Sequence, residues 1–328
     1  DRAMTRDIDW GVPVPVEGYE SKRIYVWFEA VLGYLSATRA WAEQQGAPDA
    51  WKKWWVEPDG ESYYFQGKDN VAFHTIILPA ILLGNGGLNL PTDVVANEFL
   101  TFGGFDFSKS SGNGVQLPDF LTRYEPDPLR YYLSAIMPET SDSEFTWEGF
   151  VAANNNELVA TFGNFVHRVL TITTRNFDNA VPEPGELDEA DRDALAACDT
   201  ALEEVAAALE ARRFRDGLRA AMRLARHGNR YVDTKQPWAV VKTDKPAAGT
   251  TLWVGLNMIA TLRTVFYMFV PLSADKIHSM LFSDSDTLSD GWTRRDIIPG
   301  APLEKPVPLF RKLDDSIIEE ENNRLTGG

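Results

Sequence analysis

The spacing of apolar residues changes near residue 150, and this change constrains the fold more than any other feature. Before it, short apolar runs typical of strands alternate with helical patterns, and this alternation predicts an α/β domain. Pro79 lies inside the second helical run and is expected to kink it, while residues 67–70 read as a turn. The predicted strands are Ile24–Phe28, 62–66 and 93–102, and the predicted helices begin after Glu29 and cover 71–84.

After residue 150 the apolar residues recur every three or four positions over long stretches, which predicts an all-α bundle. The predicted helices are 151–179, 187–212, 213–235 and one or two helices within 250–282. Residues 284–310 contain four prolines and little periodicity, which predicts a linker before a charged terminal helix, FRKLDDSIIEEENNRL. The length of 328 residues fits roughly two domains.

Charge and cysteine content exclude several classes of protein. The chain carries 48 acidic and 32 basic residues, a formal net charge of −16, which argues against a general nucleic-acid coat but leaves room for a local basic site. Such a surface indicates either selection for solubility or adaptation to high salt. No apolar run approaches the ~18–20 residues of a membrane span, so no membrane partner is expected. The single cysteine, Cys198, excludes an internal disulfide and fits a cytoplasmic protein.

The stretch FDFSKSSGNG at 105–114 has two interpretations. Serine, glycine and asparagine are ordinary turn residues, so the stretch fits a loose surface loop. A lysine between two serines also fits a loop that handles phosphate groups. Composition alone does not separate the two.

The order of seven segments carries a resemblance to a known family. The segments are TRDIDWGVPVP at 5–15, YVWFEAVLGY at 25–34, FQGKDNVAFHTIILPAILLG at 65–84, NEFLTFGGFDFSKSSGNGV at 97–115, DPLRYYL at 127–133, NNELVATFGNFVHRVL at 155–170 and YVDTKQPWAVVK at 231–242. Together they resemble the C-terminal part of the methionyl-tRNA synthetases, which are class I aminoacyl-tRNA synthetases. The resemblance covers nearly all of the chain.

The resemblance implies a fold and an activity. Residues 1–150 are expected to form the second half of a Rossmann-type catalytic domain, with the Ser-Lys-Ser loop and a stem-contact region. Residues 151–283 are expected to form a helical anticodon-binding domain, and 284–328 a linker and C-terminal helix. The whole enzyme is expected to activate methionine with ATP and Mg²⁺ and to transfer it to tRNA(Met).

The serine- and glycine-rich stretch gains a role from this resemblance. Ser108, Lys109 and Ser110 stand where class I synthetases carry the Lys-Met-Ser-Lys-Ser loop, which closes over ATP and stabilises charge as pyrophosphate leaves. Asp106 replaces the first lysine of that pattern, and Phe107 its methionine. The residues expected to bind ATP are Lys68, Asn97, Phe107 and Lys109.

The methionine site is implied in the same way. A thioether packs well against aromatic edges, and Asp69 can accept the ammonium of a bound amino acid. Without the resemblance, the aromatic residues are more often core, His74 a satisfied buried histidine and Asp69 a helix N-cap. Val31 departs from a proline usual in the motif. The residues expected to line the site are Trp27, Ala30, Tyr34, Asp69, Phe73, His74 and Leu78.

The bundle is expected to read an anticodon. By resemblance, Asn164, Arg168 and Trp238 recognise the CAU bases, and the indole stacks on a splayed base. Without the resemblance, Trp238 beside Pro237 is more often a plug at a helix end. Independently, residues 211–231 contain seven arginines at helical spacing, which fits either a phosphate track or a stripe paired with neighbouring acids.

One family motif is absent from the sequence. The four histidines form no His-x-Gly-His motif, which holds ATP in class I synthetases. The expected partner is therefore the missing N-terminal half of the catalytic domain, and a zinc site could lie only there. Without that half we expect no methionine activation, and poor solubility or dependence on a partner. Two alternatives are a class I synthetase for leucine, isoleucine, valine or cysteine, and a non-catalytic tRNA-binding module.

Overall fold

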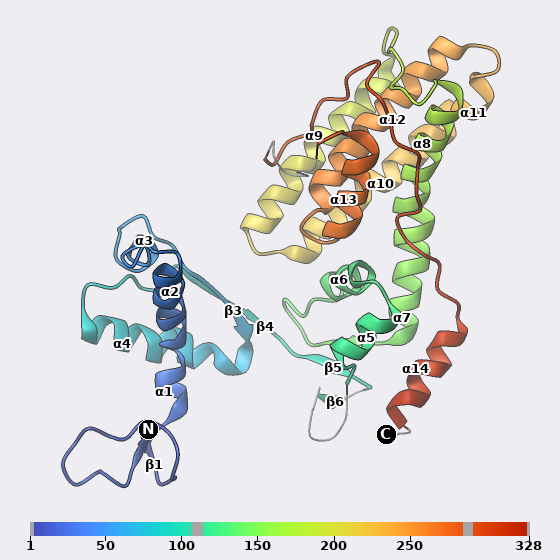
Figure 1. The fold of residues 1–328 in the computed structure, drawn as a ribbon. Coiled ribbons are helices and arrows are strands. Elements are labelled where there is room, and N and C mark those ends of the chain that lie inside the picture. Colours follow the sequence, from blue (N-terminus) through green and yellow to red (C-terminus); the bar gives the residue numbers. More distant parts are fainter. Residues whose placement is uncertain (1–2, 104, 107–113, 285–290, 327–328) are drawn as a thin grey trace. The chain divides into compact units, whose positions relative to one another are not determined.

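The structure is a computed structural model, and it divides into two compact units (Figure 1). The N-terminal unit comprises residues 1–99 and 138–141, and the C-terminal unit comprises 100–137 and 142–328. The functional division at residues 150 and 283 stays a prediction. The structure describes all residues except 1–2, 104, 107–113, 285–290 and 327–328.

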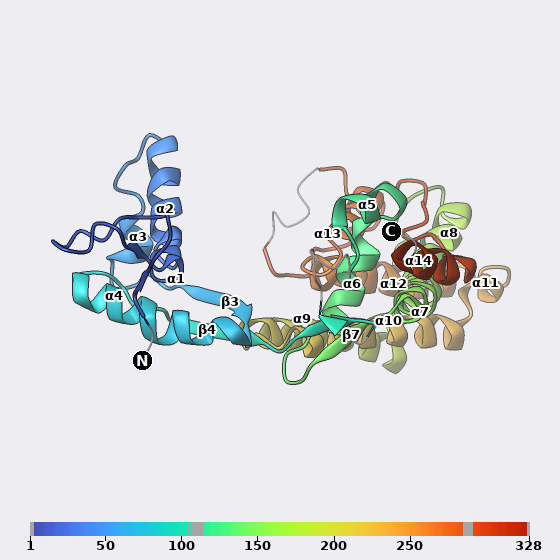
Figure 2. The same ribbon diagram turned by 90° about the horizontal axis from the view of Figure 1, so that it is seen from below.

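The N-terminal unit is built around a parallel strand pair joined by helical turns. Strands β3 and β4 pair from Tyr63 opposite Asp93 to Gly67 opposite Asn97, and they run side by side in Figure 2. Strands β1 and β2 form a separate antiparallel pair. A core of Val31, Trp55, Tyr64, Phe73, Leu78 and Leu82 lies between the helices and β3. The elements are β1 Thr5–Arg6, β2 Arg23–Ile24, α1 Val26–Ala30, α2 Gly33–Gln44, α3 Lys52–Trp55, β3 Tyr63–Gly67, the 3₁₀ turn η1 Lys68–Asn70, the π-helix η2 Phe73–Ile77, α4 Leu78–Asn85 and β4 Asp93–Asn97.

One predicted strand of this unit is wrong. The run Ile24–Phe28 pairs as a strand only through Ile24, and α1 begins at Val26. A short apolar run fits a buried strand and a buried helix equally well, so the pattern could not separate them. The predicted strand 93–102 is interrupted, because β4 ends at Asn97 and the next strand begins at Leu100.

The helical winding changes next to Pro79, where the sequence predicts a kink. The π-helix η2 ends at Ile77 and α4 begins at Leu78, so Pro79 stands in the first turn of α4. Proline has no N–H to donate and its ring crowds the preceding turn, and a wider π turn accommodates both defects. Residues 71–84 therefore remain helical, with the π-helix η2 followed directly by the α-helix α4.

The C-terminal unit begins with a small mixed sheet covered by helices. Its strand order is β6-β5-β7, with β5 antiparallel to β6 and parallel to β7. Seven buried residues, six of them aromatic, form its core: Phe102, Phe120, Tyr132, Phe145, Trp147, Phe150 and Val151. The elements are β5 Leu100–Phe102, β6 Phe105–Asp106, α5 Leu117–Arg123, α6 Pro126–Ala135, β7 Ser143–Phe145 and α7 Trp147–Ala152.

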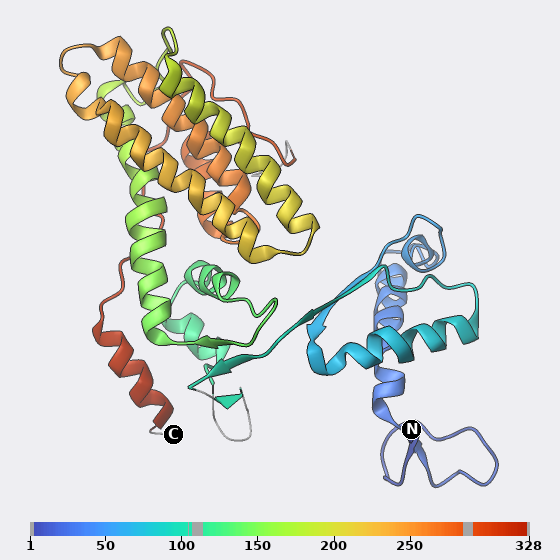
Figure 3. The same cartoon turned by 180° about the vertical axis from the view of Figure 1, so that it is seen from behind.

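The rest of this unit is the expected helical bundle. Figure 3 shows α9 and α10 running side by side, and α12 packs against both. The first predicted helix, 151–179, runs instead from Trp147 to Asn176 and contains a long π segment. Helices α9 and α10 begin within two residues of their predicted starts, whereas α12 begins at Lys245, before the predicted start at 250. None of the described helices is long and apolar enough to cross a membrane. The elements are the π-helix η3 Ala153–Gly163, α8 Asn164–Asn176, α9 Glu189–Glu210, α10 Phe214–Lys235, α11 Pro237–Val240, α12 Lys245–Phe266 and α13 Pro271–Leu281.

The terminal helix α14, Ser316–Thr326, is anchored by one buried carboxylate. Glu321 accepts two hydrogen bonds from the guanidinium of Arg123, at 2.8 and 3.0 Å, and one from the hydroxyl of Tyr124 at 2.7 Å. Burial, and then the bond to Glu321, raises the pKa of Tyr124 to about 12. The described part of 284–310 contains no helix, which agrees with the predicted linker.

Candidate substrate and anticodon sites

An aromatic cluster in the N-terminal unit joins residues from three elements. The hydroxyl of Tyr34, from α2, lies 2.9 Å from Nε2 of His74 in η2, and Nδ1 of His74 lies 3.0 Å from the carbonyl oxygen of Asn70. A carbonyl can only accept, so in the neutral ring Nδ1 donates to Asn70 and Nε2 accepts from Tyr34. Tyr64 of β3 packs edge-on against Tyr34, with ring centroids 5.1 Å apart.

The residues expected to line a methionine site divide into an exposed and a buried group. Trp27 and Ala30 of α1 and Tyr34 of α2 are exposed. Phe73 is buried and faces Trp27, with ring centroids 5.5 Å apart. Leu78 is fully buried and belongs to the core of the unit.

Two of the four residues expected at ATP, Lys68 and Asn97, lie where the two parallel strands end. Lys68 follows β3 directly, forms an ion pair with Glu98, and places its Nζ 4.2 Å from the ring centroid of Phe99. Asn97 is the last residue of β4. Ligands of α/β sheets bind beyond the carboxyl ends of parallel strands, so the position suits a nucleotide or amino acid.

Asp69 lies beside these residues with an exposed carboxylate. Its Oδ1 accepts one hydrogen bond from the Asn70 side chain at 3.3 Å. The N-cap of η1 is Gly67 rather than Asp69, so capping does not occupy the carboxylate. A Cβ at Gly67 would stand 2.9 Å from Oδ1 of Asp69, so the glycine makes room for that side chain.

The expected catalytic loop falls outside the described part of the chain. Phe107, Ser108, Lys109 and Ser110 all lie within residues 107–113. The backbone before them is described: Asp106 ends β6 and pairs with Thr101 of β5. The assignment of these residues stays a prediction.

The three expected anticodon residues come together in the C-terminal unit. Arg168 of α8 places its guanidinium carbon 4.9 Å from the ring centroid of Trp238 and donates to Asp233 of α10 at 2.7 Å. Asn164, one turn before Arg168, donates to Asn229 of α10 at 3.3 Å. Trp238 is 37% exposed, whereas a plug at a helix end is expected to be buried. The side chains thus combine an open aromatic surface with amide and charged groups.

Asn164 and Arg168 line a depression of about 330 Å³ between η3, α8 and α10, here called the recess. Trp238 is not part of this lining and lies against Arg168. The sequence analysis did not single out Asn229 and Asp233, which contribute to the recess from α10. The helical spacing of this segment could have indicated both residues. One helical face is shared by Arg226, Asn229, Arg230 and Asp233, which are spaced three, one and three residues apart. All four line the recess.

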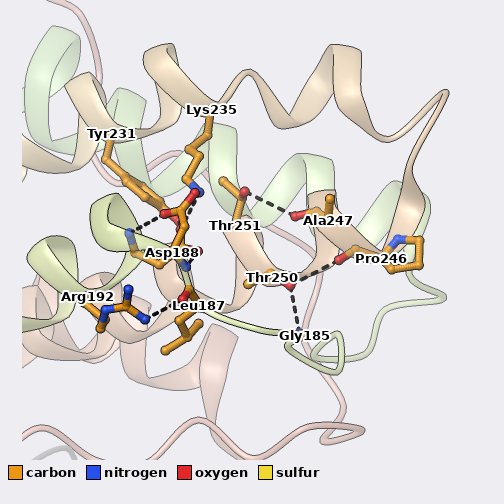
Figure 4. Close-up of polar contacts among 11 residues, drawn as sticks. Gly185, Leu187, Asp188, Arg192, Tyr231, Lys235, Pro246, Ala247, Thr250 and Thr251 are labelled. Carbon is orange, nitrogen blue, oxygen red and sulfur yellow. Dashed lines mark hydrogen bonds and ion pairs between the residues drawn. The ribbon is translucent and has the colours of Figure 1, made fainter.

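A polar cluster holds the end of α10, three residues before Trp238. Nζ of Lys235, the last residue of α10, lies 2.6 Å from Asp188 and 2.7 Å from Asp191, and the hydroxyl of Tyr231 donates to Asp191 at 2.7 Å. Figure 4 shows Tyr231 and Lys235 converging on the start of α9. Gln236 then adopts a left-handed conformation, with φ of 46°, and α11 begins at Pro237. The cluster therefore fixes the turn that presents Trp238.

The start of α9 is itself tightly held. Asp188 and Asp191 form a reciprocal capping box with two bonds of 3.0 Å. The hydrogen bond from Lys235 holds the pKa of Asp188 below its usual range. Burial, and then the bond to Asp191, raises the pKa of the Tyr231 phenol well above its ordinary value.

The segment before α9 is also attached to α12 (Figure 4). The backbone N–H of Gly185 donates to Oγ1 of Thr250 at 2.8 Å, and that hydroxyl donates to the carbonyl oxygen of Pro246 at 3.2 Å. Arg192 donates to the carbonyl oxygen of Leu187 at 2.5 Å. Helices α9, α10 and α12 are thereby joined close to the turn that carries Trp238.

Models of known protein families match both parts of the chain. The family described as "tRNA synthetases class I (M)" matches residues 1–170. The chain belongs to this family. The family described as "Anticodon binding domain of methionyl tRNA ligase" matches residues 181–328. The match of both families confirms the resemblance and the predicted order of a class I catalytic portion followed by a helical anticodon-binding domain.

Known members of the family are similar over nearly the whole chain. The methionine–tRNA ligase of Dehalococcoides mccartyi is 51% identical over 325 residues, which are 99% of this chain and 59% of that protein. The ligase of a Roseiflexus species is 46% identical over 357 residues, covering 99% and 60%. The structure of Mycobacterium tuberculosis methionyl-tRNA synthetase in complex with methionyl-adenylate superimposes with a TM-score of 0.82 at 29% identity, covering 94% of this chain and 60% of that one. The chain thus spans about 60% of the length of these relatives.

Proposed function

We propose that this chain is the part of a methionyl-tRNA synthetase that reads the anticodon of tRNA(Met) and contributes to the methionine and ATP sites. The observation that carries the proposal is the contact of Arg168 with Trp238 and Asp233, which both lie in the part of the chain, 181–328, that matches the methionyl anticodon-binding family. Other class I synthetases are disfavoured because this second family match is specific to methionyl-tRNA ligase. This function implies a cytoplasmic location, because tRNA is charged in the cytoplasm.

The recess suits recognition of single-stranded RNA. Bases splayed out of a loop stack on aromatic rings and are identified by hydrogen bonds to their edges. Trp238 supplies the ring, and Asp233 keeps the guanidinium of Arg168 beside it. Asn164 donates through Nδ2 to Oδ1 of Asn229 and keeps its own Oδ1 for a base edge. Nδ2 of Asn229 already donates to the carbonyl oxygens of Thr161 and Ala225, so this amide positions Asn164.

The N-terminal unit supplies groups for methionine. Trp27 and Phe73 present aromatic rings to a thioether, and the carboxylate of Asp69 is available for an ammonium group. The hydroxyl of Tyr34 is committed to His74, so Tyr34 offers methionine its exposed ring. Phe73 and His74 are both buried and hold the wall of the site in place.

Two lysines, Lys68 and Lys109, are proposed to serve ATP. Lys109 stabilises the negative charge that develops as pyrophosphate leaves, with Mg²⁺ bound to the phosphates and Ser108 and Ser110 beside it. Lys68, Asn97 and Phe107 are proposed as further contacts to the nucleotide. The ion pair of Lys68 with Glu98 holds that ammonium at the end of β3. The partner of the chain is the remaining catalytic region of the family, which carries the His-x-Gly-His motif and any zinc.

The catalytic proposal is tested by joining this chain to the preceding region of the Dehalococcoides mccartyi ligase. We expect methionine-dependent exchange of pyrophosphate into ATP and charging of a tRNA with a CAU anticodon. The same chimera with Lys109→Ala should lose about 100-fold or more in rate, the usual effect of removing one group that stabilises developing charge. Exposed Lys52 lies on α3, so Lys52→Ala is the matched control and should retain the rate.

Two outcomes would contradict this assignment. A folded chimera that binds tRNA but exchanges no pyrophosphate would favour the non-catalytic tRNA-binding module. An equal loss with Lys109→Ala and Lys52→Ala would show that the role given to Lys109 is wrong.

A further inference from the structure

Two depressions on the C-terminal unit meet at α10. One is the recess beside Trp238, and the other is a groove of about 680 Å³ between α9 and α10. Arg226 and Arg230 line both of them. They stand one helical turn apart, so their side chains lie on the same ridge between the two depressions. A strand that leaves the recess toward the groove must therefore pass these two arginines.

These two arginines differ from their neighbours in having no acidic partner among the described residues. Arg168 pairs with Asp233, and Arg223 pairs with Glu204 across the groove. Arg226 and Arg230 are both exposed, and neither forms an ion pair or hydrogen bond with a described residue. In a chain with 48 acids and 32 bases, adjacent cations without partners concentrate positive potential at one place.

The acidic residues and the histidine that line the groove favour a single RNA strand over a duplex as its ligand. Asp193 and Glu204 stand on the α9 wall, so the positive strip is confined to the α10 side. His227 lies between the two arginines, and burial together with Arg230 holds its pKa below the ordinary value. It therefore offers a hydrogen bond rather than a charge near neutral pH. A strip one side chain wide fits the phosphates of a single strand better than the two backbones of a duplex.

We propose that Arg226 and Arg230 bind the sugar–phosphate backbone of the RNA strand that continues from the bases in the recess, and guide it into the groove between α9 and α10. Guanidinium groups suit this role because they bind phosphate oxygens through two parallel hydrogen bonds. The contacts position the RNA and carry no base specificity. The inference rests on the proposed function, in which the recess receives the anticodon bases.

The test compares binding of two RNA hairpins by the whole chain and by the double variant Arg226→Gln/Arg230→Gln. One hairpin carries a CAU anticodon and the other a changed anticodon, and each dissociation constant is measured between about 50 and 200 mM KCl. We expect the double variant to bind both hairpins about tenfold more weakly at low salt, with its preference for CAU unchanged. The slope of log K against log salt should fall by about 1.4, or about 0.7 for each phosphate contact to a single strand.

The matched control is Arg219→Gln. Arg219 is exposed on the same helix, pairs with Asp216 at 3.4 Å and lines neither depression, so its loss should leave affinity and slope nearly unchanged. A double variant with the wild-type slope would overturn the phosphate path while leaving the proposed function intact, provided that the wild type prefers CAU. A wild type without that preference would overturn both. Circular dichroism of each variant shows whether the bundle remains folded.

Discussion

Replacing Trp238 by alanine should weaken binding of a CAU-anticodon RNA by about 10- to 100-fold. Stacking of one base on an aromatic ring contributes about 1–3 kcal/mol, and the alanine variant keeps no ring at that position. Trp238 is partly exposed and lies against the guanidinium of Arg168, so its removal opens little of the core. The dissociation constant of the whole chain for the RNA hairpin measures the effect.

The control is Trp238→Phe, which keeps a smaller ring. It should recover much of the affinity lost in the alanine variant, because stacking depends on an aromatic face rather than on the indole N–H. Unchanged affinity in the alanine variant would restore the alternative in which Trp238 only closes a helix end. Far-ultraviolet circular dichroism should show the same helical content in all three proteins.

Replacing Asp191 by alanine should lower the free energy of unfolding by about 3 kcal/mol. Asp191 is 2% exposed and accepts from Tyr231, Lys235 and the backbone N–H of Asp188. Removing one partner of a buried charged pair leaves the others without compensation, which typically costs about 3–5 kcal/mol. We place the value at the low end because Lys235 keeps its ion pair with Asp188 when Asp191 is replaced. Urea unfolding followed by circular dichroism measures the loss.

The matched control is Asp188→Asn, which keeps an N-cap side chain and removes only an exposed charge. Near pH 7 it should cost about 0.2–1 kcal/mol, as exposed ion pairs do. Because Lys235 lowers the pKa of Asp188 in the folded state, this contribution is present above the unfolded pKa of about 3.9 and is lost as pH falls through the folded pKa. Equal losses for the two variants near pH 7 would contradict the central place given to Asp191.

Long periodic helices could be predicted from the sequence because their pattern repeats over many turns. Helices α9 and α10 begin within two residues of the predicted starts, and α10 ends at the residue predicted from Pro237. The run Ile24–Phe28 failed because five apolar residues fit either periodicity. The π windings have no simple sequence signal, since they depend on how side chains pack around the wider turns.

Some residues of the candidate sites could also be predicted from the sequence, whereas their contacts could not. Resemblance placed Arg168 and Trp238 in one site, and the structure brings them together although 69 intervening residues separate them. Spacing on α10 could have added Asn229 and Asp233. The contact between Tyr34 and His74 depends on the packing of α2 against η2, which the spacing of 40 residues does not reveal. The sharing of Arg226 and Arg230 by two depressions required the structure.

Recognition of the tRNA(Met) anticodon is the proposed role of the C-terminal unit. The most direct test measures binding of the unmodified chain to a tRNA with a CAU anticodon and to the same tRNA with one anticodon base changed, at low and high KCl. Each mismatched base should cost about 1–3 kcal/mol, so we predict roughly 10- to 100-fold weaker binding of the changed tRNA. Equal affinity for the two tRNAs, with the bundle folded by circular dichroism, would contradict the account.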